Sequence, residues 1–593
     1  MKPYSLLVFL FAAFFSQATG ELPWYRRTNF YQVYPRSFKD SDGDGTGDLK
    51  GVAQKAQHFK DIGLDAIWLS PFFPSPNKDF GYDVSDFKNV DPLYGNMDDF
   101  KNLAKTLAGL GIKFVIDFVP NHSSDLHPWF QLSVNRTHPY TDYYVWDNGT
   151  IDDGGKHHPP NNWLSVFGGS AWEWHEGRQQ YYYHAFLKEQ PDLNYNNPAV
   201  VAEMEDVIRF WLDIGVDGFR LDSANYMFES DNRSENETLI PGETDATQWK
   251  NYVHNLTQNQ DKTYELFHNW ALIFYNYSTG KSGKPRALFM EVYTDLDHTI
   301  MYYGHGNTSL MFPFNFELLV QGNQSLTSSD FKRIIDSWLD KMPKDGVANW
   351  VVGNHDNGRV ADRYGFEMVD AINLLTGVLP GMKVTYYGDE IGMRNTFVRW
   401  SQNVDPSGQS LGPDNYLKAS RDPERTPMQW DSSPSAGFSS NKTTWLPVNP
   451  DYWWLNVEKQ KAADSSHLKV FQTLSKVRQD EVLLNGTTKV LAPDDDTLII
   501  LRTLNSSYFA LLINLGSELR EYTTLDLALP SNVDVQVVIV SENVEHKIGD
   551  KIAANSTKIQ LRPKAAILVK SSATQLFLSL PLFVCLLLGN FWR

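Results

Sequence analysis

Four acidic side chains stand at or near the ends of short apolar runs in the sequence. They are Asp117 in FVIDFVPNH, Asp222 in GFRLDS, Glu291 in LFMEVY and Asp356 in VGNHDN. A carboxylate beside an apolar strand is costly unless it is paired or takes part in a reaction. Two carboxylates held about 5 Å apart can cleave a glycosidic bond with retention, because one attacks the anomeric carbon while the other protonates the leaving oxygen.

Neighbouring residues suggest which carboxyl does which task. Arg220 lies two residues before Asp222, on the same face of a strand, and its charge favours an ionised carboxylate, so we expect Asp222 to be the nucleophile. Glu291 follows four apolar residues, and burial against them would raise its pKa, which suits an acid/base. His122 and His355 stand beside acidic strand ends and could bond sugar hydroxyls. Any one of these residues alone is better explained as a structural group.

The elements that must position these residues are short buried strands alternating with amphipathic helices. Helical patterns cover residues 98–110 and 200–214, for example. This alternation indicates a parallel sheet covered by helices, and about eight strands predict a closed (β/α)8 barrel, in which chemistry lies at the carboxyl ends of the strands. The expected strands are 30–34, 66–69, 113–119, 218–221, 287–290, 309–314, 347–352 and 383–387.

Changes of pattern divide the chain into domains. Residues 120–198 are rich in Trp, Tyr, Asn, Pro and Gly and predict a loop-rich domain inserted after the third strand. Residues 394–456 are a second irregular stretch. Alternating strands then predict a C-terminal antiparallel β-domain over 481–570. We expect barrel segments at 21–119 and 199–480, and β-domain strands at 497–503, 508–514, 535–540, 558–561 and 566–569.

Both ends of the chain are apolar. Residues 1–20 are typical of a cleaved secretory signal peptide, with Lys2, an apolar run and a small-x-small end. Residues 571–593 begin with small residues and continue into an apolar tail, which favours a glycosylphosphatidylinositol (GPI) anchor signal. A short membrane helix or a packed tail is the alternative. We therefore expect the secretory pathway and the extracellular face of the plasma membrane. The one cysteine, Cys585, lies in this tail.

The composition fits a secreted globular protein. The 593 residues carry 53 Lys and Arg against 71 Asp and Glu, a net charge of −18, which argues against nucleic-acid binding. Aromatic residues make up 14% and suit either stacking on sugar rings or a large aromatic core. Asn121 begins a glycosylation sequon but is expected to be buried. Sequons that support secretion begin at Asn135, Asn148, Asn232, Asn236, Asn255, Asn276, Asn307, Asn323, Asn441, Asn485, Asn505 and Asn555.

The motifs in combination resemble the α-amylase family, glycoside hydrolase family 13. DFVPNH, GFRLDS, FMEVY and VGNHDN resemble its four ordered sequence regions. QPDLN (190–194) and RTPMQWD (425–431) resemble its α-glucosidase and oligo-1,6-glucosidase branch, and residues 24–569 as a whole resemble insect maltases. The resemblance implies Asp222 as nucleophile, Glu291 as acid/base and Asp356 as transition-state stabiliser, with a supporting set of Arg220, His122, His355 and Asp117.

The resemblance also bears on the substrate. In the family, residues matching Asp83 and Arg359 pair across the non-reducing end of the glucosyl unit, which leaves a pocket for one terminal glucose. Tyr82 and Phe167 would be its stacking walls, unless they are simply core residues. Ser223, next to the nucleophile, is small, and small residues there go with α-1,4 preference. We therefore expect an exo-acting, retaining α-glucosidase acting on maltose, sucrose and short maltooligosaccharides.

A loop after the first expected strand places acidic residues at alternate positions, with glycines between them. This spacing suits a hard cation, although a solvated acidic turn is the alternative. The resemblance implies a structural calcium site in which Thr46 contributes its carbonyl. The expected ligands are Asp40, Asp42, Asp44, Thr46 and Asp48.

Two readings compete with a simple enzyme. The family includes heavy subunits of amino-acid transporters, which keep the barrel but lose catalytic carboxylates and begin with a membrane helix. This chain keeps the full set of carboxylates and begins with an expected cleavable signal. Mosquito midgut maltases of this kind also serve as anchored receptors for a bacterial binary toxin, so a toxin ligand is an alternative or additional partner.

Overall fold

A computed structural model of the chain describes residues 23–280, 283–523, 526–527, 529–530, 533–554 and 558–571. The predicted signal peptide lies outside these residues, as do Cys585, Asn555 and all of the predicted anchor signal except Ser571. Within the described part, no helix combines the length and the apolar character needed to cross a membrane.

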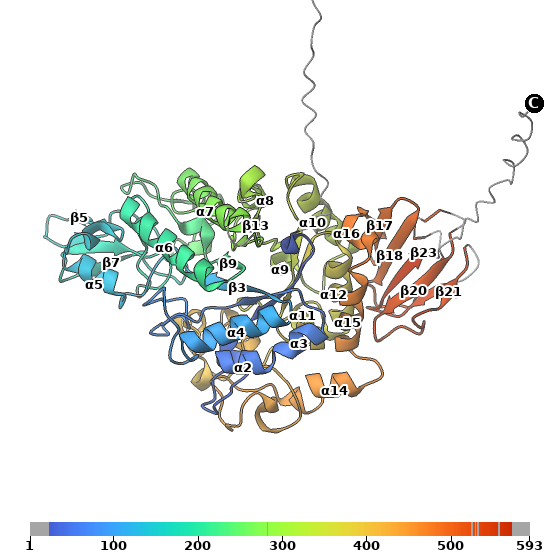
Figure 1. The fold of residues 1–593 in the computed structure, drawn as a ribbon. Helices are drawn as coiled ribbons and strands as arrows, with labels where there is room; N and C mark the ends of the chain where they lie inside the picture. The colour runs from blue at the N-terminus through green and yellow to red at the C-terminus, as the bar shows by residue number, and fades with distance from the viewer. Residues whose placement is uncertain are drawn as a thin grey trace, which may run out of the picture.

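Eight parallel strands form the centre of the molecule. Each strand pairs with its neighbour in the sheet, and the first barrel strand of the chain pairs with the last, in the order expected of a (β/α)8 barrel (Figure 1). In sheet order they are β13 (Met311–Pro313), β12 (Ala287–Met290), β9 (Gly218–Leu221), β3 (Lys113–Phe118), β2 (Ala66–Leu69), β1 (Asn29–Val33), β15 (Met382–Tyr386) and β14 (Asn349–Val351).

The side chain of Asn349 links the two ends of this sheet, β13 and β14. It is fully buried, its Nδ2 donates to the carbonyl of Pro313 at 2.8 Å, and its Oδ1 accepts from the amide of Asn315 at 2.7 Å. A primary amide offers a donor and an acceptor in one plane. The Asn349 side chain therefore supplies here the hydrogen-bond donor and acceptor that backbone amides supply between the other strands.

Helices on the outside cover the strands because their apolar faces need burial. In α4 (Met97–Gly109), Asn96 caps the first turn with Asp99, and Phe100 and Leu103 are buried. The other covering helices are α3 (Ala56–Asp61), α6 (Pro198–Ile214), α7 (Asp261–Thr279), α8 (Leu296–Met301), α10 (Ser328–Lys341), α12 (Val369–Val378) and α15 (His467–Val477). Shorter helices are α1 (Pro35–Phe38), α2 (Leu49–Gln54), α9 (Glu317–Gln321), α11 (Val360–Arg363) and α16 (Glu481–Asn485).

The segment between β3 and α6 forms the inserted, loop-rich domain at the left of Figure 1. It has a small aromatic core of its own that includes Trp163, Trp172 and Tyr183. A β-bridge between His122 and Asp192 ties it back to the barrel end. Its elements are α5 (Pro128–Val134), β4 (Trp146–Asp147), β5 (Thr150–Ile151), β6 (His157–His158), β7 (Trp172–His175) and β8 (Gln180–Tyr183).

Two further regions follow in the chain. A short pair, β10 (Thr238–Leu239) and β11 (Tyr252–Val253), lies in the long loop after β9. The second irregular stretch, 394–456, consists of short turns and α13 (Pro406–Ser410), and leads into α14 (Val457–Ala462) at the bottom of Figure 1. Both regions follow carboxyl ends of barrel strands, where a barrel builds its site.

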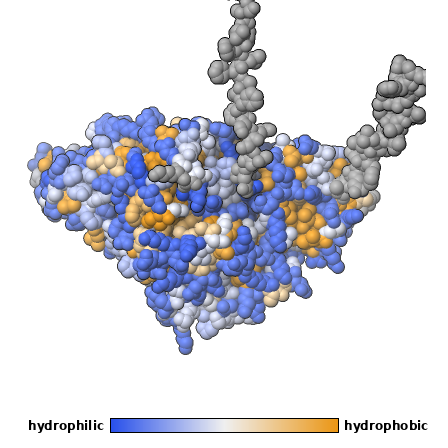
Figure 2. Space-filling view, viewed as in Figure 1, coloured by the Kyte–Doolittle hydropathy of each residue, from blue (hydrophilic) through white to orange (hydrophobic). Residues whose placement is uncertain are grey.

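The C-terminal β-domain, at the right of Figure 1, consists of a six-stranded antiparallel sheet and a separate antiparallel pair of strands. Ile499 of β17 packs in the domain's own core, whereas the next residue, Ile500, joins the barrel core, as alternation along a strand requires. Hydrophobic residues also gather in patches over this domain in Figure 2, although hydrophilic residues cover most of that face. The strands are β16 (Thr487–Asp494), β17 (Thr497–Leu504), β18 (Ser507–Asn514), β19 (Arg520–Tyr522), β20 (Val535–Val540), β21 (Lys551–Ile552), β22 (Ile559–Leu561) and β23 (Ala566–Ser571).

Candidate active site

A cavity of about 380 Å³ opens at the carboxyl end of the barrel and contains three of the four acidic residues singled out above. Asp222 directly follows β9, Glu291 directly follows the neighbouring strand β12, and Asp356 lies in the loop after β14. All three line the cavity, and Asp222 and Glu291 are nearly buried. Asp117 lies behind them within β3 and is fully buried.

The guanidinium of Arg220 joins the carboxyls of three adjacent strands. Its Nη1 donates to Asp117 Oδ1 at 2.8 Å and to Asp222 Oδ1 at 2.7 Å, and its Nη2 forms an ion pair with Glu291. The same group lies over the ring of Trp68, at 4.7 Å. Because two nitrogens of one planar group reach both carboxyls, Asp222 and Glu291 are held close together in fixed orientations.

Ser223 also touches both of these carboxyls. Its backbone N donates to Glu291 Oε2 at 3.1 Å, and its hydroxyl donates to Asp222 Oδ2 at 2.8 Å. Burial raises the pKa of Glu291 well above its ordinary value, against the opposing effect of Arg220, and the nearby charges of Asp222 and Asp356 raise it further. Glu291 therefore keeps its proton to a higher pH than an ordinary glutamate, as a general acid requires.

Asp356 has the opposite environment, because two arginines bond one of its oxygens. Arg425 Nη2 donates to Asp356 Oδ1 at 2.8 Å, and Arg421 Nη1 donates to the same oxygen at 3.1 Å. Burial alone would raise the pKa of Asp356, but His355 and the two guanidinium groups outweigh it and hold that pKa well below its usual range. Asp356 is therefore ionised at neutral pH.

A chain of hydrogen bonds connects His355 to Asp117. Gln32 Nε2 donates to His355 Nδ1 at 2.8 Å, which leaves Nε2 of the imidazole facing the Tyr82 hydroxyl at 2.6 Å. That hydroxyl donates to Asp117 Oδ2 at 3.2 Å. Burial lowers the pKa of His355 and raises that of Asp117 to about 7. The chain fixes the neutral imidazole and orients its Nε2 at the cavity wall.

His122 is held in the same way from the inserted domain. Its Nδ1 lies 2.8 Å from Asn121 Oδ1, and its Nε2 lies 3.0 Å from Gln190 Nε2, which belongs to the QPDLN segment. Burial lowers the pKa of His122 to about 4, so the ring is neutral at neutral pH. Asn121 is buried, as expected, and so is an unsuitable glycosylation site.

The predicted pairing of Asp83 with Arg359 is wrong. Asp83 is turned into its own loop, where it accepts from the Ser75 hydroxyl at 2.7 Å and from the Lys78 amide at 2.8 Å. Arg359 is fully buried in the barrel and donates to the carbonyl of Tyr387 at 2.7 Å. Neither residue lines the cavity, because each is committed to holding a loop in place.

The charged pair at the cavity wall is instead Asp79 with Arg421. Arg421 Nη2 donates to Asp79 Oδ1 at 2.9 Å, and Asp405 anchors the guanidinium from the other side at 2.6 Å. Burial raises the pKa of Asp79 to about 6 despite this arginine. Asp83 accepts from the Asp79 amide at 3.0 Å, so Asp83 holds the backbone of the residue that forms the charged pair. The sequence prediction chose Asp83 and did not consider Asp79, which stands four residues earlier in the same irregular loop.

Aromatic side chains form the remaining walls of the cavity. Tyr82 and Phe167 line it, as expected; Tyr82 also stacks on His355 at 5.3 Å, and Arg421 lies over the Phe167 ring at 5.5 Å. Sequence reasoning missed the other aromatic wall residues, because they come from irregular loops without periodicity. They are Phe186, Tyr226, Trp249 and Tyr293.

Trp249 is the best supported of these missed residues. Its ring stacks on His254 with centroids 4.2 Å apart and planes 12° from parallel. His254 Nδ1 in turn lies 2.8 Å from Glu237 Oε2, and Thr257 donates to the other oxygen of that carboxylate at 2.7 Å. The indole is therefore a flat wall held from behind by a fixed imidazole.

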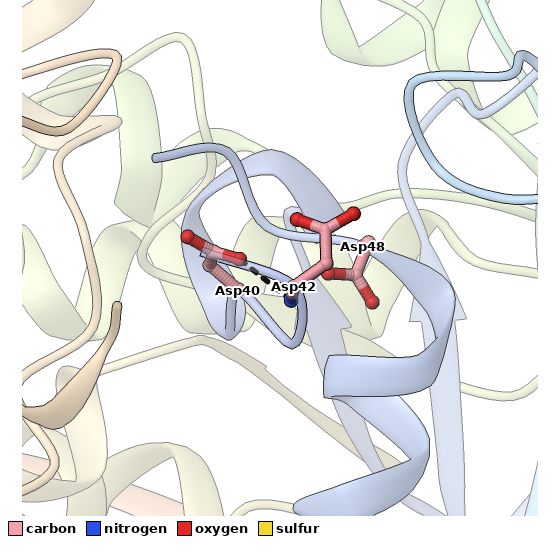
Figure 3. A group of neighbouring side chains, drawn as sticks. All are labelled: Asp40, Asp42 and Asp48. Atoms are coloured by element: carbon pink, nitrogen blue, oxygen red, sulfur yellow. Dashed lines mark hydrogen bonds between the residues drawn. The ribbon is translucent and has the colours of Figure 1, made fainter. Parts of the chain in front are cut away.

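The acidic loop after β1 brings Asp40, Asp42 and Asp48 together, each with an oxygen within 4.8 Å of the others (Figure 3). Three converging carboxylates fit the oxygen preference of a hard cation such as Ca²⁺. Asp44 is not part of this group, and its Oδ1 accepts from the Thr46 amide at 2.7 Å. Three of the four expected aspartates therefore converge, and Asp44 does not.

Comparisons with known proteins give the same picture at the level of the whole chain. The family model described as "Alpha amylase, catalytic domain" matches residues 32–486. "Maltase 1" of Drosophila virilis is 44% identical over 94% of this chain and 88% of its own length. A crystal structure of the alpha-glucosyl transfer enzyme XgtA superimposes with a TM-score of 0.82 at 32% identity, covering 93% of this chain and 100% of that one. The human "Amino acid transporter heavy chain SLC3A1" is 39% identical over 89% of this chain and 76% of its own.

Proposed function

Because the chain belongs to the alpha-amylase family, we propose that it is an exo-acting, retaining α-glucosidase. It removes terminal, non-reducing, α-1,4-linked glucose from maltose, sucrose and short maltooligosaccharides. The observation that carries this proposal is that the Arg220 guanidinium bonds Asp222 and also forms an ion pair with Glu291. Retaining enzymes hold their two carboxyls about 5 Å apart, whereas inverting enzymes need roughly 6.5–9.5 Å to admit a water molecule. Two carboxyls on one guanidinium favour the close arrangement.

In the first step, a carboxylate oxygen of Asp222 attacks the anomeric carbon of the bound glucose. Glu291 gives its proton to the glycosidic oxygen as the bond to that oxygen breaks, and the leaving sugar departs as an alcohol. Glucose is then joined to Asp222 as an ester. The raised pKa of Glu291 supports this assignment, because the acid must carry its proton at the start.

In the second step, Glu291, now ionised, takes a proton from a water molecule. The resulting oxygen attacks the anomeric carbon from the side that the leaving sugar vacated, and Asp222 leaves as a carboxylate. Two inversions give net retention. Arg220 bonds both carboxyls, so the negative charge can move from Asp222 to Glu291 without leaving the reach of one cation.

Asp356 stabilises the transition state by bonding ring hydroxyls of the glucose. Arg421 and Arg425 occupy its Oδ1, while Oδ2, which lies 3.3 Å from His355 Nε2, keeps a lone pair that can accept from the sugar. The same arginines keep the carboxylate ionised, which strengthens such hydrogen bonds. His122 and His355 present neutral imidazoles beside it.

The wall that Asp79 and Arg421 build supports exo action. This ion pair stands in the cavity lining together with Tyr82 and Phe167. A charged pair that crosses the end of a groove leaves room for a terminal glucose but not for a continuing chain. Trp249 supplies a flat apolar surface on which the leaving sugar can stack.

The decisive experiment compares initial rates on maltose, sucrose, isomaltose and soluble starch. We expect maltose and sucrose to be cleaved with release of α-glucose, isomaltose more slowly, and starch hardly at all. Glu291→Gln is the blank. Release of β-glucose would contradict retention, and faster cleavage of starch than of maltose would contradict exo action.

The similarity to a transporter heavy chain raises the alternative of a non-catalytic subunit. The presence of all four acidic residues in one site counts against it. If purified protein with a native fold cleaved no α-glucoside, the alternative would replace the enzyme. Toxin binding remains a separate expectation. It is best tested with Asp222→Asn protein, because binding of a toxin to this inactive variant cannot depend on catalysis.

Two further expectations belong to this proposal. The loop of Asp40, Asp42 and Asp48 holds a structural Ca²⁺ that stabilises the barrel end, supported by the convergence of the three carboxylates. The protein is secreted, glycosylated and carried on the outer face of the plasma membrane by a GPI anchor. Support for secretion comes from the sequons, since their asparagines at 135, 148, 232, 236, 255, 276, 307, 323, 485 and 505 are exposed.

A further inference from the structure

A second cavity, of about 640 Å³, lies at the same end of the barrel but shares no lining residue with the first. Its walls come from α11 after β14 and from two parts of the segment after β15. Nothing in the reaction described above uses it. Its lining residues are Asp362, Arg394, Asn395, Thr396, Phe397, Arg399, Gln402, Pro447, Val448, Asn449, Pro450 and Asp451.

Hydrogen bonds between the loops fix the polar floor of this second cavity. The Asn395 amide donates to Asp362 Oδ2 at 2.6 Å, and Asn395 Oδ1 accepts from the Arg359 amide at 2.9 Å. Asn449 Nδ2 donates to the carbonyl of Asn395 at 3.1 Å, which ties the two parts of the segment together. Asp451 is held by Gln429 at 2.7 Å. The walls are therefore preorganised before any ligand arrives.

Several polar groups in this cavity remain available to a ligand. The guanidinium of Arg394 lies over the Phe366 ring at 5.3 Å and donates no hydrogen bond within the described part of the chain. Each bond named above uses only one oxygen of Asp362 and one of Asp451, so each carboxylate keeps a second acceptor. The two arginines in the lining balance the two aspartates, so the cavity favours a neutral ligand over an ion.

Phe397 adds an apolar face to this polar setting. Its side chain is 68% exposed, although it is among the lining residues. An exposed phenyl ring is unfavourable in water unless something covers it. A flat aromatic face beside planar guanidinium and carboxylate groups is the combination that a sugar needs, because a sugar has an apolar ring face and vicinal hydroxyls.

We propose that the second cavity is a carbohydrate-binding site for a neutral gluco-oligosaccharide, separate from the reaction site. Phe397 packs on a sugar face while Arg394, Asp362 and Asp451 bond its hydroxyls. The choice of glucose units rests on the proposed function; the choice of a neutral sugar rests on the cavity itself. Because both cavities open at the same barrel end, the second site raises the local concentration of substrate near the first.

The test counts binding events on full-length protein that cannot turn over. Maltotriose is titrated into Asp222→Asn protein by calorimetry, and two events are expected. Adding Phe397→Ala or Arg394→Ala should weaken one event at least tenfold and leave the other unchanged. Trp453→Ala is the matched control, because Trp453 is an aromatic of similar exposure, 64%, that does not line the cavity. Melting temperatures verify that all variants fold.

The outcomes separate this proposal from the proposed function. In active protein, Phe397→Ala and Arg394→Ala should keep kcat/KM on maltose within twofold. A single binding event in a protein that cleaves maltose would overturn the second site and leave the enzyme. Two events in a protein that cleaves no glucoside would overturn the enzyme and leave the second site. Two maltotriose-binding events that both keep their affinity in Phe397→Ala and in Arg394→Ala would also refute the proposal.

Discussion

Ser223 has an unusual backbone between the two reacting carboxyls. Its φ of 49° lies in the left-handed region, which is uncommon for residues other than glycine. This geometry aims its amide at Glu291 and its hydroxyl at Asp222. A β-branched residue such as Val would be strained there and would lose the hydroxyl. The size of this residue, on which a linkage preference was predicted, is therefore only part of what it does.

We expect Ser223→Ala to lower kcat/KM on maltose by about 10- to 100-fold. A hydrogen bond to a charged group contributes roughly 1.5–3 kcal/mol, and this one fixes the nucleophile. Steady-state kinetics provide the measurement. Ser407→Ala is the control, since Ser407 lines the same cavity but bonds neither carboxyl, and it should change kcat/KM less than threefold. Equal effects of the two variants would argue against a specific role for the Ser223 hydroxyl.

The pKa of Glu291 predicts the alkaline limb of the pH profile. The acid works only while protonated, and its pKa is raised, so kcat/KM should fall as the pH rises through that raised value. Glu291→Gln should reduce kcat on maltose by about 10²–10⁴-fold.

The same variant should remove the alkaline limb for a glucoside whose leaving group departs without a proton. The pH profiles of kcat/KM for the unmodified protein and for Glu291→Gln are measured with a p-nitrophenyl glucoside from pH 4 to 9. If the limb persisted unchanged in Glu291→Gln, another group would be the acid.

At the residue scale, the sequence was informative where a side chain follows a regular strand. Asp222 and Glu291 could be placed because β9 and β12 are apolar runs that end immediately before them. Asp79 and Arg421 could not, because they stand in irregular loops and meet across 342 positions of the chain. Which of two nearby aspartates faces a cavity depends on loop conformation, and no periodicity reports that.

At the scale of elements, the apolar runs located the barrel well. The expected strands 66–69, 218–221 and 287–290 coincide with β2, β9 and β12, because a strand buried on both faces is apolar throughout. The expected strand 309–314 shortens to β13 (Met311–Pro313). Strands β16, β19 and β21 were missed: β16 is largely solvent-facing, and the other two are very short.

Asn349 provides a test of how the barrel is closed. Asn349→Ala leaves the Asn315 amide and the Pro313 carbonyl buried without partners, so it should destabilise the protein by about 2–4 kcal/mol. The apparent Tm at a fixed scan rate is the measurement. Asn102→Ala, at an exposed position of α4, should leave Tm within a degree. Similar Tm values for both variants would mean that the strands close without this side chain.

The acidic loop predicts a calcium effect on stability. Removing Ca²⁺ with a chelator should lower Tm by a few degrees, since a ligand at about 100 times its Kd contributes roughly 2.7 kcal/mol. Added Ca²⁺ should restore Tm, but not in Asp42→Asn. Asp245→Asn, an exposed carboxylate outside the group, should keep the full response. A Tm indifferent to chelation in the unmodified protein would rule out the site.

At the scale of the whole molecule, the alternation of strands and helices was enough to predict the class of fold. The barrel, the inserted domain and the terminal β-domain all appear in that order. What composition and periodicity could not give is the way the β-domain joins the barrel core through alternate residues such as Ile500. That contact depends on how two folded surfaces pack together, and each surface is formed by residues from distant parts of the chain.

Attachment to membranes is the prediction that belongs to this scale. β23 ends at Ser571, so a lipid on one of the next residues would attach just beyond the terminal sheet. Phosphatidylinositol-specific phospholipase C should release most α-glucosidase activity from cell membranes into solution. Deleting residues 572–593 should send the active enzyme into the medium. Activity that leaves the membrane only with detergent would favour a membrane helix instead.

Arg421 is bonded by Asp79, Asp356 and Asp405, which come from three distant parts of the chain. All of its charge is thus committed before a sugar enters. This wall of the cavity is therefore already in place when a sugar enters, so forming it adds little ordering cost to binding. Binding of glucosides should consequently follow a single kinetic phase in rapid-mixing experiments, with no slower phase from a conformational change.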